Sequence, residues 1–378
     1  MLTTQLQAIA DSLGSWIDAR HVAVLSSLAF LWLLLIHSLM ITDVWDETNA
    51  ILILKSEPVA SLGAMEAAVM VWLQQLPLDV YRPLGSSLFM VLGKLFDGDF
   101  VLLRYFNAGL LLAAAWLFYA ALVKLGCSRM RAVLFFTLSL FSSAALITAG
   151  WFANIFDATC LFFLALAIWA YVGRRTYLCC LALTLAIFSK EIYVVALPFL
   201  ALLVYQDPRR NRRDVLTLAL IITGFSLLYW LLRQAAIPLG SSADIHTFSP
   251  ATFANSSLSF FAGAVFQFSK FSQYGPLFWA GLAVLAGSLV AIRNYPALLT
   301  LAVILLLSTG VYWGMFSYQG EAVVTAHNFV GRLYLVPIVL FLFIACRYGH
   351  RTSLLALTVA GLVGFVITYI DHRTFHPT

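Results

Sequence analysis

Three carboxylates stand within five residues of one another, directly after the first long hydrophobic run of the chain: Asp43, Asp46 and Glu47. Ionisable groups are costly close to hydrocarbon, so acids gathered where a membrane-spanning segment ends indicate a site that binds a ligand or takes a proton. A carboxylate can deprotonate a hydroxyl group or hold a divalent cation. The alternative is that these acids only solvate the end of a helix.

Three further clusters place cations or carboxylates next to hydrophobic runs. They contain Asp79, Tyr81 and Arg82; Lys190 and Glu191; and His327, Arg332 and Tyr334. Arginine and lysine bind phosphate through charge-assisted hydrogen bonds, so the clusters together suit a lipid substrate that carries phosphate. The opposing interpretations are that Arg82 is a surface turn residue or an interfacial anchor, and that Arg332 only reaches the lipid headgroups. Lys190 and Glu191 can likewise form an internal ion pair.

Two weaker candidates complete the set. Asp157 stands at the beginning of a hydrophobic run and can serve as a second carboxylate for the acceptor or for a metal. It can equally be an acid that stabilises the positive end of a helix dipole. His327 can assist acid–base chemistry, but a lone loop histidine is more often only solvated.

The composition indicates what kind of protein must position these residues. Hydrophobic residues make up 62% and charged residues 10% of the 378 residues, and the mean hydropathy is +0.93. Soluble domains contain about 45–50% apolar and about 25% charged residues. We therefore expect an all-α polytopic membrane protein, because repeated apolar runs approach the roughly 20 residues that cross a bilayer as a helix.

About eleven such runs are present, which predicts about 11 transmembrane helices. They cover residues 22–42, 100–125, 129–149, 156–173, 176–189, 191–205, 215–236, 275–292, 296–316, 330–346 and 352–370. The runs 176–189 and 191–205 are short and meet at Lys190. They can form two helices, a re-entrant hairpin or one broken helix.

The distribution of charge predicts the orientation. Lysine and arginine collect in alternate connections, which is typical of cytoplasmic loops, and most acids lie in the opposite ones. We expect a multi-pass protein of a bacterial inner membrane, with a cytoplasmic N-terminus and with the first loop and the C-terminus in the periplasm. The net charge of +5 is largely this orientation signal, so no nucleic-acid partner is predicted.

The chain is predicted to form a single membrane domain, residues 1–378, without a separate soluble domain. Residues 1–20 carry apolar side chains at helical spacing and are expected to lie on the inner leaflet. Two outer loops are long, residues 43–99 and 237–274. The first holds amphipathic segments near 59–76 and 84–96.

The order of these features resembles the glycosyltransferase C (GT-C) superfamily. A short cytoplasmic N-terminus, one span, an outer loop that opens with Asp46 and Glu47, and about eleven spans are similar to that family over nearly the whole chain. The segments 81–84, 189–191 and 331–334 look like short motifs of its protein O-mannosyltransferase and aminoarabinose-transferase members. Unlike many members of that family, the chain is not expected to carry a carboxy-terminal soluble domain.

The resemblance implies an integral membrane glycosyltransferase that moves a sugar from a polyprenyl-phosphate donor to an extracytoplasmic hydroxyl of a glycan, lipid or protein, with inversion. Asp46 is the expected base, Asp43 its rival and Glu47 an orienting partner. The expected ligands of the donor phosphate are Arg82, Lys190 and Arg332. Further substrate contacts are expected from Tyr81, Asp157, Glu191, His327 and Tyr334.

No cofactor is expected to be required, because three cations can hold the phosphate. If a divalent metal is used, Asp43, Asp46 and Asp157 are its expected ligands. A lipid flippase or transporter is the main alternative, and it predicts charges deep within helices, discontinuous spans or inverted repeats. An O-antigen-ligase-like transferase is a second one, and a noncatalytic scaffold a third.

Overall fold

The computed structural model describes residues 2–39, 53–57, 59–73, 81–208, 211–236, 283–284, 286–319 and 335–375, and its regular elements there are all helices. The α-helices are α1 (Leu2–Leu39), α3 (Ala64–Trp72), α4 (Pro83–Leu95), α5 (Phe100–Lys124), α6 (Arg129–Leu140), α7 (Ser143–Gly150), α8 (Ile155–Val172), α9 (Thr176–Ser189), α10 (Leu197–Gln206), α11 (Arg212–Ala236), α14 (Tyr295–Gln319), α16 (Leu335–Tyr348) and α17 (Arg351–Phe375). Three 3₁₀ segments are η1 (Val59–Ser61), η2 (Phe152–Asn154) and η3 (Glu191–Ala196). The all-α prediction is confirmed.

Four helices of the described residues are long and apolar enough to cross a membrane: Gly14–Ser38, Val101–Lys124, Ile155–Val172 and Arg212–Ala235. A bent pair, Arg129–Leu140 with Ala144–Gly150, makes a fifth if it is one span. Six further apolar helices are shorter, 10–17 residues each. The predicted number of eleven is therefore not confirmed, although helices lie where most of the runs were placed. Half of the predicted span 275–292 lies outside the described residues.

The predicted span 129–149 is not one straight helix. Helices α6 and α7 meet at 52°. The hydroxyl of Ser142 accepts a hydrogen bond from the Ala145 amide at 3.2 Å, which caps a new helix at this point. A serine at an N-cap satisfies an amide that would otherwise lack a partner, so it favours a fresh start over continuation.

Helix α1 joins the predicted interfacial segment to the first span. It is bent at Arg20, whose φ of −124° and ψ of 16° are not helical. This residue separates the expected segment 1–20 from the expected span 22–42, but the candidate span already begins at Gly14.

The segment from α9 to α10 is a hairpin. Lys190, between the two parts, has extended backbone at φ −164° and ψ 144°, and η3 follows it. The guanidinium of Arg174, before α9, pairs with the carboxylate of Asp207, after α10, with Nη2 and Oδ1 2.7 Å apart. Because the outer ends of the segment meet, the chain turns back at Lys190, which decides against one broken helix.

The lysine- and arginine-rich connections meet at one end of the bundle. Besides the Arg174–Asp207 pair, Arg347 donates to the Leu125 carbonyl at 2.9 Å and Arg131 to the Arg347 carbonyl at 3.4 Å. The charge pattern placed these connections on one side of a membrane, and they do lie together. That this side is cytoplasmic stays a prediction.

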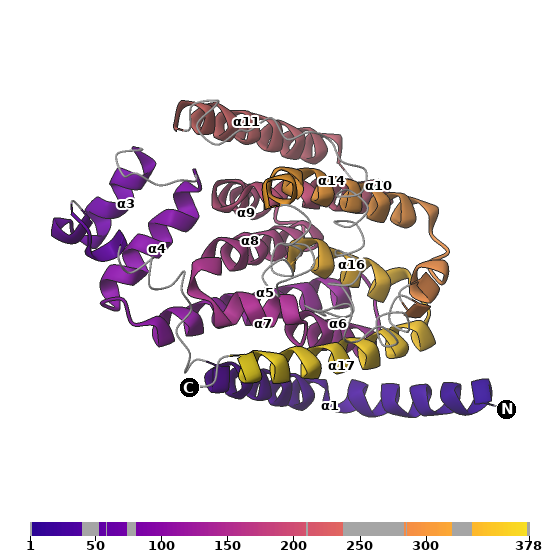
Figure 1. The fold of residues 1–378 in the computed structure, drawn as a ribbon. Helices are drawn as coiled ribbons and strands as arrows, with labels where there is room; N and C mark the ends of the chain where they lie inside the picture. Colours follow the sequence, from indigo (N-terminus) through magenta and orange to yellow (C-terminus); the bar gives the residue numbers. More distant parts are fainter. Residues whose placement is uncertain are drawn as a thin grey trace.

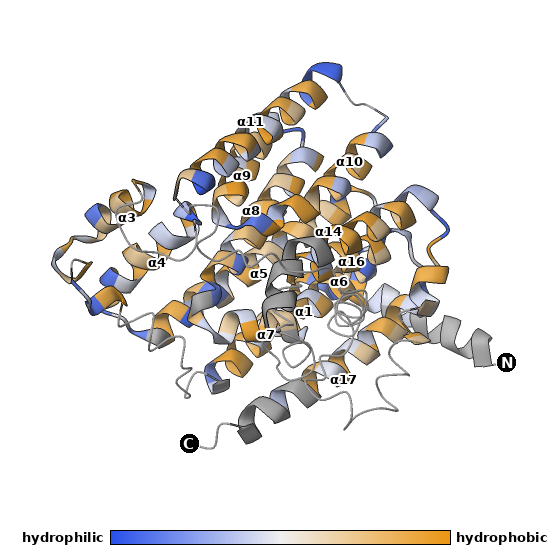
Figure 2. Cartoon of the chain, turned by 45° about the horizontal axis from the view of Figure 1, so that its top comes forward, coloured by the Kyte–Doolittle hydropathy of each residue, from blue (hydrophilic) through white to orange (hydrophobic). Residues whose placement is uncertain are grey.

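Two hydrophobic cores hold the helices. The larger one runs through the bundle, and Figure 2 shows that its helices are mostly apolar, with hydrophilic residues concentrated toward helix ends and connections. A smaller core joins α3 and α4 to the beginnings of α5 and α8 through Val71, Phe89, Leu103 and Ile155. In Figure 1, α3 and α4 lie together at one end of the bundle. The expected amphipathic segments of the first loop are thus helices that pack on this end.

Candidate functional site

An ion pair joins the first-loop helices to the α9–α10 hairpin. Arg82 precedes α4, and Pro83 occupies the first turn, where a missing amide proton costs nothing. The Arg82 Nε donates to Glu191 Oε2 at 3.0 Å, and its Nη2 donates to Oε1. The two side chains are 18% and 31% exposed. This is a bidentate pair at a partly accessible position.

A second ion pair lies directly beside the first and is buried. Lys190 Nζ is 2.6 Å from Asp157 Oδ1 and 2.7 Å from Oδ2, and the two side chains are 4% and 5% exposed. Lys190 adjoins Glu191 in sequence, and the Arg82 guanidinium lies 5.4 Å from the ring of Phe156, next to Asp157. The four charged groups form one cluster, which we call the paired-charge cluster.

Aromatic side chains surround the paired-charge cluster. The hydroxyl of Tyr229, on α11, donates to the Tyr81 carbonyl at 3.0 Å, and the two rings have centroids 5.9 Å apart. Phe188 lies 6.2 Å from the Tyr229 ring. The backbone that carries Arg82 is thereby tied to α11, which fixes the guanidinium in place.

The electrostatics of Arg82 favour its charged form. Burial lowers the pKa of its guanidinium, but the Glu191 carboxylate more than offsets this, so the net direction is upward. Arg82 therefore stays protonated at any working pH. Because two acids match two bases, the paired-charge cluster has no net charge.

The structure brings together five of the predicted site residues: Tyr81, Arg82, Asp157, Lys190 and Glu191. The opposing interpretation, an ion pair between Lys190 and Glu191, does not hold, since Lys190 pairs with Asp157 and Glu191 with Arg82. Both hydrogen bonds described for the Lys190 ammonium go to the Asp157 carboxylate. The role of Lys190 as a phosphate ligand therefore stays a prediction. Of the two described cations, Arg82 is the more accessible. The other predicted residues lie outside the described ones: Asp43, Asp46, Glu47, His327, Arg332 and Tyr334.

Sequence reasoning missed two polar groups near this end. Tyr229 carries no signal beyond its place near the end of an apolar helix. Arg104 was not among the predicted site residues, yet it is 1% exposed on α5, one helical turn before Asn107, which is fully buried. An arginine in an apolar run is the signal that identifies such a position.

The described residues do not supply the cluster of ligands that a metal site needs. No group of three or more histidine, cysteine, aspartate or glutamate side chains that could hold a metal ion occurs among them. Two of the expected metal ligands, Asp43 and Asp46, lie outside the described residues, and the carboxylate of the third, Asp157, accepts hydrogen bonds from Lys190. The pairing also removes part of the positive charge on which the expectation of metal-free phosphate binding depended.

Gly85 sets the distance between α4 and α8 beside the paired-charge cluster. A Cβ at this position would lie 2.3 Å from Cδ1 of Phe156, so the ring has to move. We expect Gly85→Ala to lower the free energy of unfolding by about 1–3 kcal/mol, the usual cost of overpacking. Unfolding in mixed detergent, followed by circular dichroism, measures this. The control is Gly109→Ala on α5, where nothing lies within 4 Å of the added carbon, and equal stabilities of the two variants would contradict the prediction.

Comparisons with known proteins give no family. No protein-family model matches the sequence, no curated protein is significantly similar to it, and no solved structure is significantly similar to the fold.

Proposed function

We propose that this protein is an integral membrane glycosyltransferase that uses a sugar linked to a polyprenyl phosphate and transfers it to an acceptor hydroxyl. The proposal rests on the sequence motifs and on one structural observation. Segments 81–82, 157 and 190–191, which come from three parts of the chain, meet at the end of the bundle opposite its arginine-rich connections. That is the arrangement expected of a polar site at one membrane face.

The chemical step follows from the predicted residues. Asp46 takes the proton of the acceptor hydroxyl as its oxygen forms a bond to the anomeric carbon. The bond from that carbon to the phosphate oxygen breaks, and the polyprenyl phosphate leaves with the electron pair. Attack opposite the leaving group inverts the configuration.

Arg82 is the described residue best suited to the leaving phosphate. Its guanidinium is partly exposed and presents a planar fork of donors, which phosphate can share with Glu191. A cation lowers the barrier if it binds the phosphate more strongly as charge develops. Lys190 and Asp157 are buried, and in this proposal they position Glu191 and the start of α8.

A transporter of a lipid-linked substrate is a second candidate. A buried ion pair, Lys190 with Asp157, lies at the break between α9 and η3. Buried charges and interrupted helices are both typical of transport pathways. The transferase is preferred because the described charges of this site gather at one end, together with first-loop helices.

Transfer of radiolabelled sugar from synthetic polyprenyl-phosphate sugars by the purified protein, with membrane extract as the acceptor source, tests the proposal. Asp46→Asn is expected to lower the rate about 10²–10⁴-fold, the contribution typical of a general base.

The matched control is Asp97→Asn, an exposed acid in the turn before α5. If Asp46→Asn is folded and loses transfer while Asp97→Asn keeps it, the result supports both the glycosyltransferase activity and the role of Asp46 as base. Equal transfer by both variants removes Asp46 from the mechanism. No transfer from any donor, combined with movement of a labelled lipid across vesicles, would replace the proposal by the transporter.

A further inference from the structure

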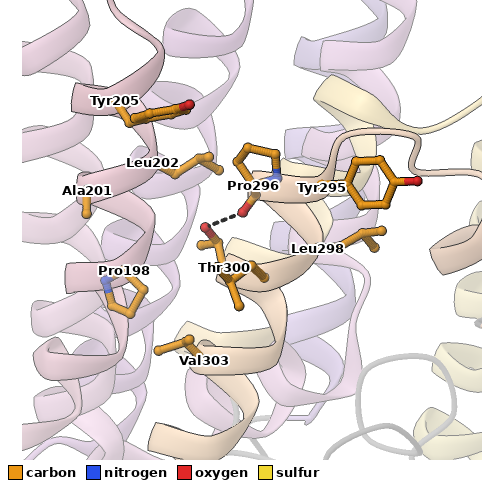
Figure 3. A pocket seen from close by; sticks show the side chains of 10 residues that line it. Pro198, Ala201, Leu202, Tyr205, Tyr295, Pro296, Leu298, Thr300 and Val303 are labelled. Atoms are coloured by element: carbon orange, nitrogen blue, oxygen red, sulfur yellow. Dashed lines mark hydrogen bonds between the residues drawn. The ribbon is translucent and has the colours of Figure 1, made fainter.

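An apolar groove of about 910 Å³ runs between α10 and α14 (Figure 3). The polar side chain of Thr300 within it donates to the Pro296 carbonyl at 2.8 Å, so its hydrogen is already used. Most of the lining side chains are apolar, among them Ala201 and Leu202 of α10 and Leu299 and Val303 of α14. Such walls suit a hydrocarbon chain.

A second groove, of about 350 Å³, lies against α10 on the side toward α11. The two grooves share Ala201 and Tyr205. Ala201 is exposed and has the smallest apolar side chain that a helix offers, so α10 forms only a low ridge between the grooves. Two grooves separated by one ridge match the two chains of a diacyl lipid.

One end of the larger groove is polar. Tyr205 and Tyr295 lie at this end, opposite Pro198 and Val303 (Figure 3), and they are 66% and 85% exposed. Just beyond them the Gln206 amide donates to Asn294 at 3.5 Å. Tyrosines at the edge of an apolar surface are typical of the interface between membrane and water.

Basic side chains lie beyond the tyrosines. Arg293 precedes Tyr295 and is exposed, and Arg212 and Arg213 are exposed at the beginning of α11. The acid that follows α10, Asp207, is already paired with Arg174. Asp214, also in the first turn of α11, offsets one of these three arginine charges, so arginine remains in excess and suits an anionic headgroup.

We infer that α10 carries a binding site for one anionic diacyl phospholipid, whose chains lie in the two grooves and whose phosphate faces Arg293. The site is separate from the proposed transfer reaction, because Lys190 and Glu191 are at the opposite end of the α9–α10 hairpin from Tyr205. A second copy of the chain is a poorer occupant, since a symmetric contact here would bring the same arginines together.

Heat denaturation of the delipidated full-length protein in detergent tests this site with three probes of equal chain length. Phosphatidylglycerol is expected to raise the midpoint by about 3 °C or more at saturation, because ligand bound only to the folded state stabilises it. Phosphatidylcholine and the single-chain lysophosphatidylglycerol are expected to give less than half of that shift. Arg293→Gln is expected to remove the preference for phosphatidylglycerol over phosphatidylcholine.

Two variants that fill the groove, Ala201→Trp and Leu299→Trp, keep the test decisive if one of them does not fold. Each is expected to abolish the shift, whereas Leu220→Trp, at a position on α11 that is 72% exposed and lines neither groove, is expected to retain it. The inference is overturned if the shift persists in a groove-filling variant, if the three probes act equally, or if native mass spectrometry shows a lipid-free dimer.

Discussion

Asp157→Ala is expected to lower the free energy of unfolding by about 3–5 kcal/mol, because it leaves the Lys190 ammonium buried without a counter-ion. The Lys190 and Asp157 side chains are only 4% and 5% exposed, so water cannot replace the lost partner. Equilibrium unfolding in mixtures of a mild and a denaturing detergent, followed by far-ultraviolet circular dichroism, measures the change.

The Arg174–Asp207 pair supplies a matched control at the other end of the hairpin. The Arg174 and Asp207 side chains are 51% and 12% exposed, and water can solvate the guanidinium when its partner is removed. Since a solvent-accessible pair contributes about 1 kcal/mol or less, Asp207→Ala is expected to have a smaller effect than Asp157→Ala. The double variant Asp157→Leu with Lys190→Met removes both buried charges and is expected to recover most of the stability. If Asp157→Ala and Asp207→Ala lower the free energy of unfolding equally, burial is not the reason why the Lys190–Asp157 pair stabilises the protein.

Arg82→Gln is expected to reduce sugar transfer about 10²–10³-fold, the loss typical of removing one preorganised donor that faces a developing negative charge. This result rests on the proposed function. The loss of stability is expected to be smaller than for Asp157→Ala, because Arg82 and Glu191 are 18% and 31% exposed and retain some hydration. Steady-state kinetics with the donor varied, together with the unfolding assay, separates the two effects.

Glu191→Gln distinguishes a functional Arg82 from a structural one. If the guanidinium holds the donor phosphate, loss of its carboxylate partner frees it, so kcat and the donor KM change little in this variant. If Arg82 serves only to hold α3 and α4 against η3, Arg82→Gln and Glu191→Gln each break the same ion pair and impair sugar transfer to the same extent. Arg82→Lys is expected to rescue only part of the activity, since an ammonium group cannot form the bidentate contact.

Much of the local structure can be predicted from the sequence. Apolar runs of sufficient length bury their own backbone hydrogen bonds in helices, so the run 176–189 coincides with α9 and the run 156–173 nearly coincides with α8. The segregation of arginine into alternate connections likewise anticipated that those connections meet, as Arg174 and Asp207 do. Both signals are local or periodic, and they do not depend on which helices are neighbours.

The bend between α6 and α7 is a feature that hydropathy and charge patterns did not predict. Beyond Arg131 the run 129–149 carries no charged residue, and hydropathy alone cannot detect that Ser142 caps a new helix within it. Tyr229 was missed for a related reason. Its hydrogen bond reaches the Tyr81 carbonyl across 148 positions of the sequence, and nothing near Tyr229 indicates that distant partner.

By itself the sequence determined the class of the protein, the places of most helices and the residue types available for chemistry, because these follow from solvation of the backbone and from the cost of charge near hydrocarbon. Only the tertiary structure decided which charges meet. Arg82 binds Glu191 across 109 positions and Lys190 binds Asp157 across 33, although Lys190 and Glu191 are neighbours in the chain. Such pairings arise from helix packing, which orients each side chain toward another element, and no periodicity along the chain records it.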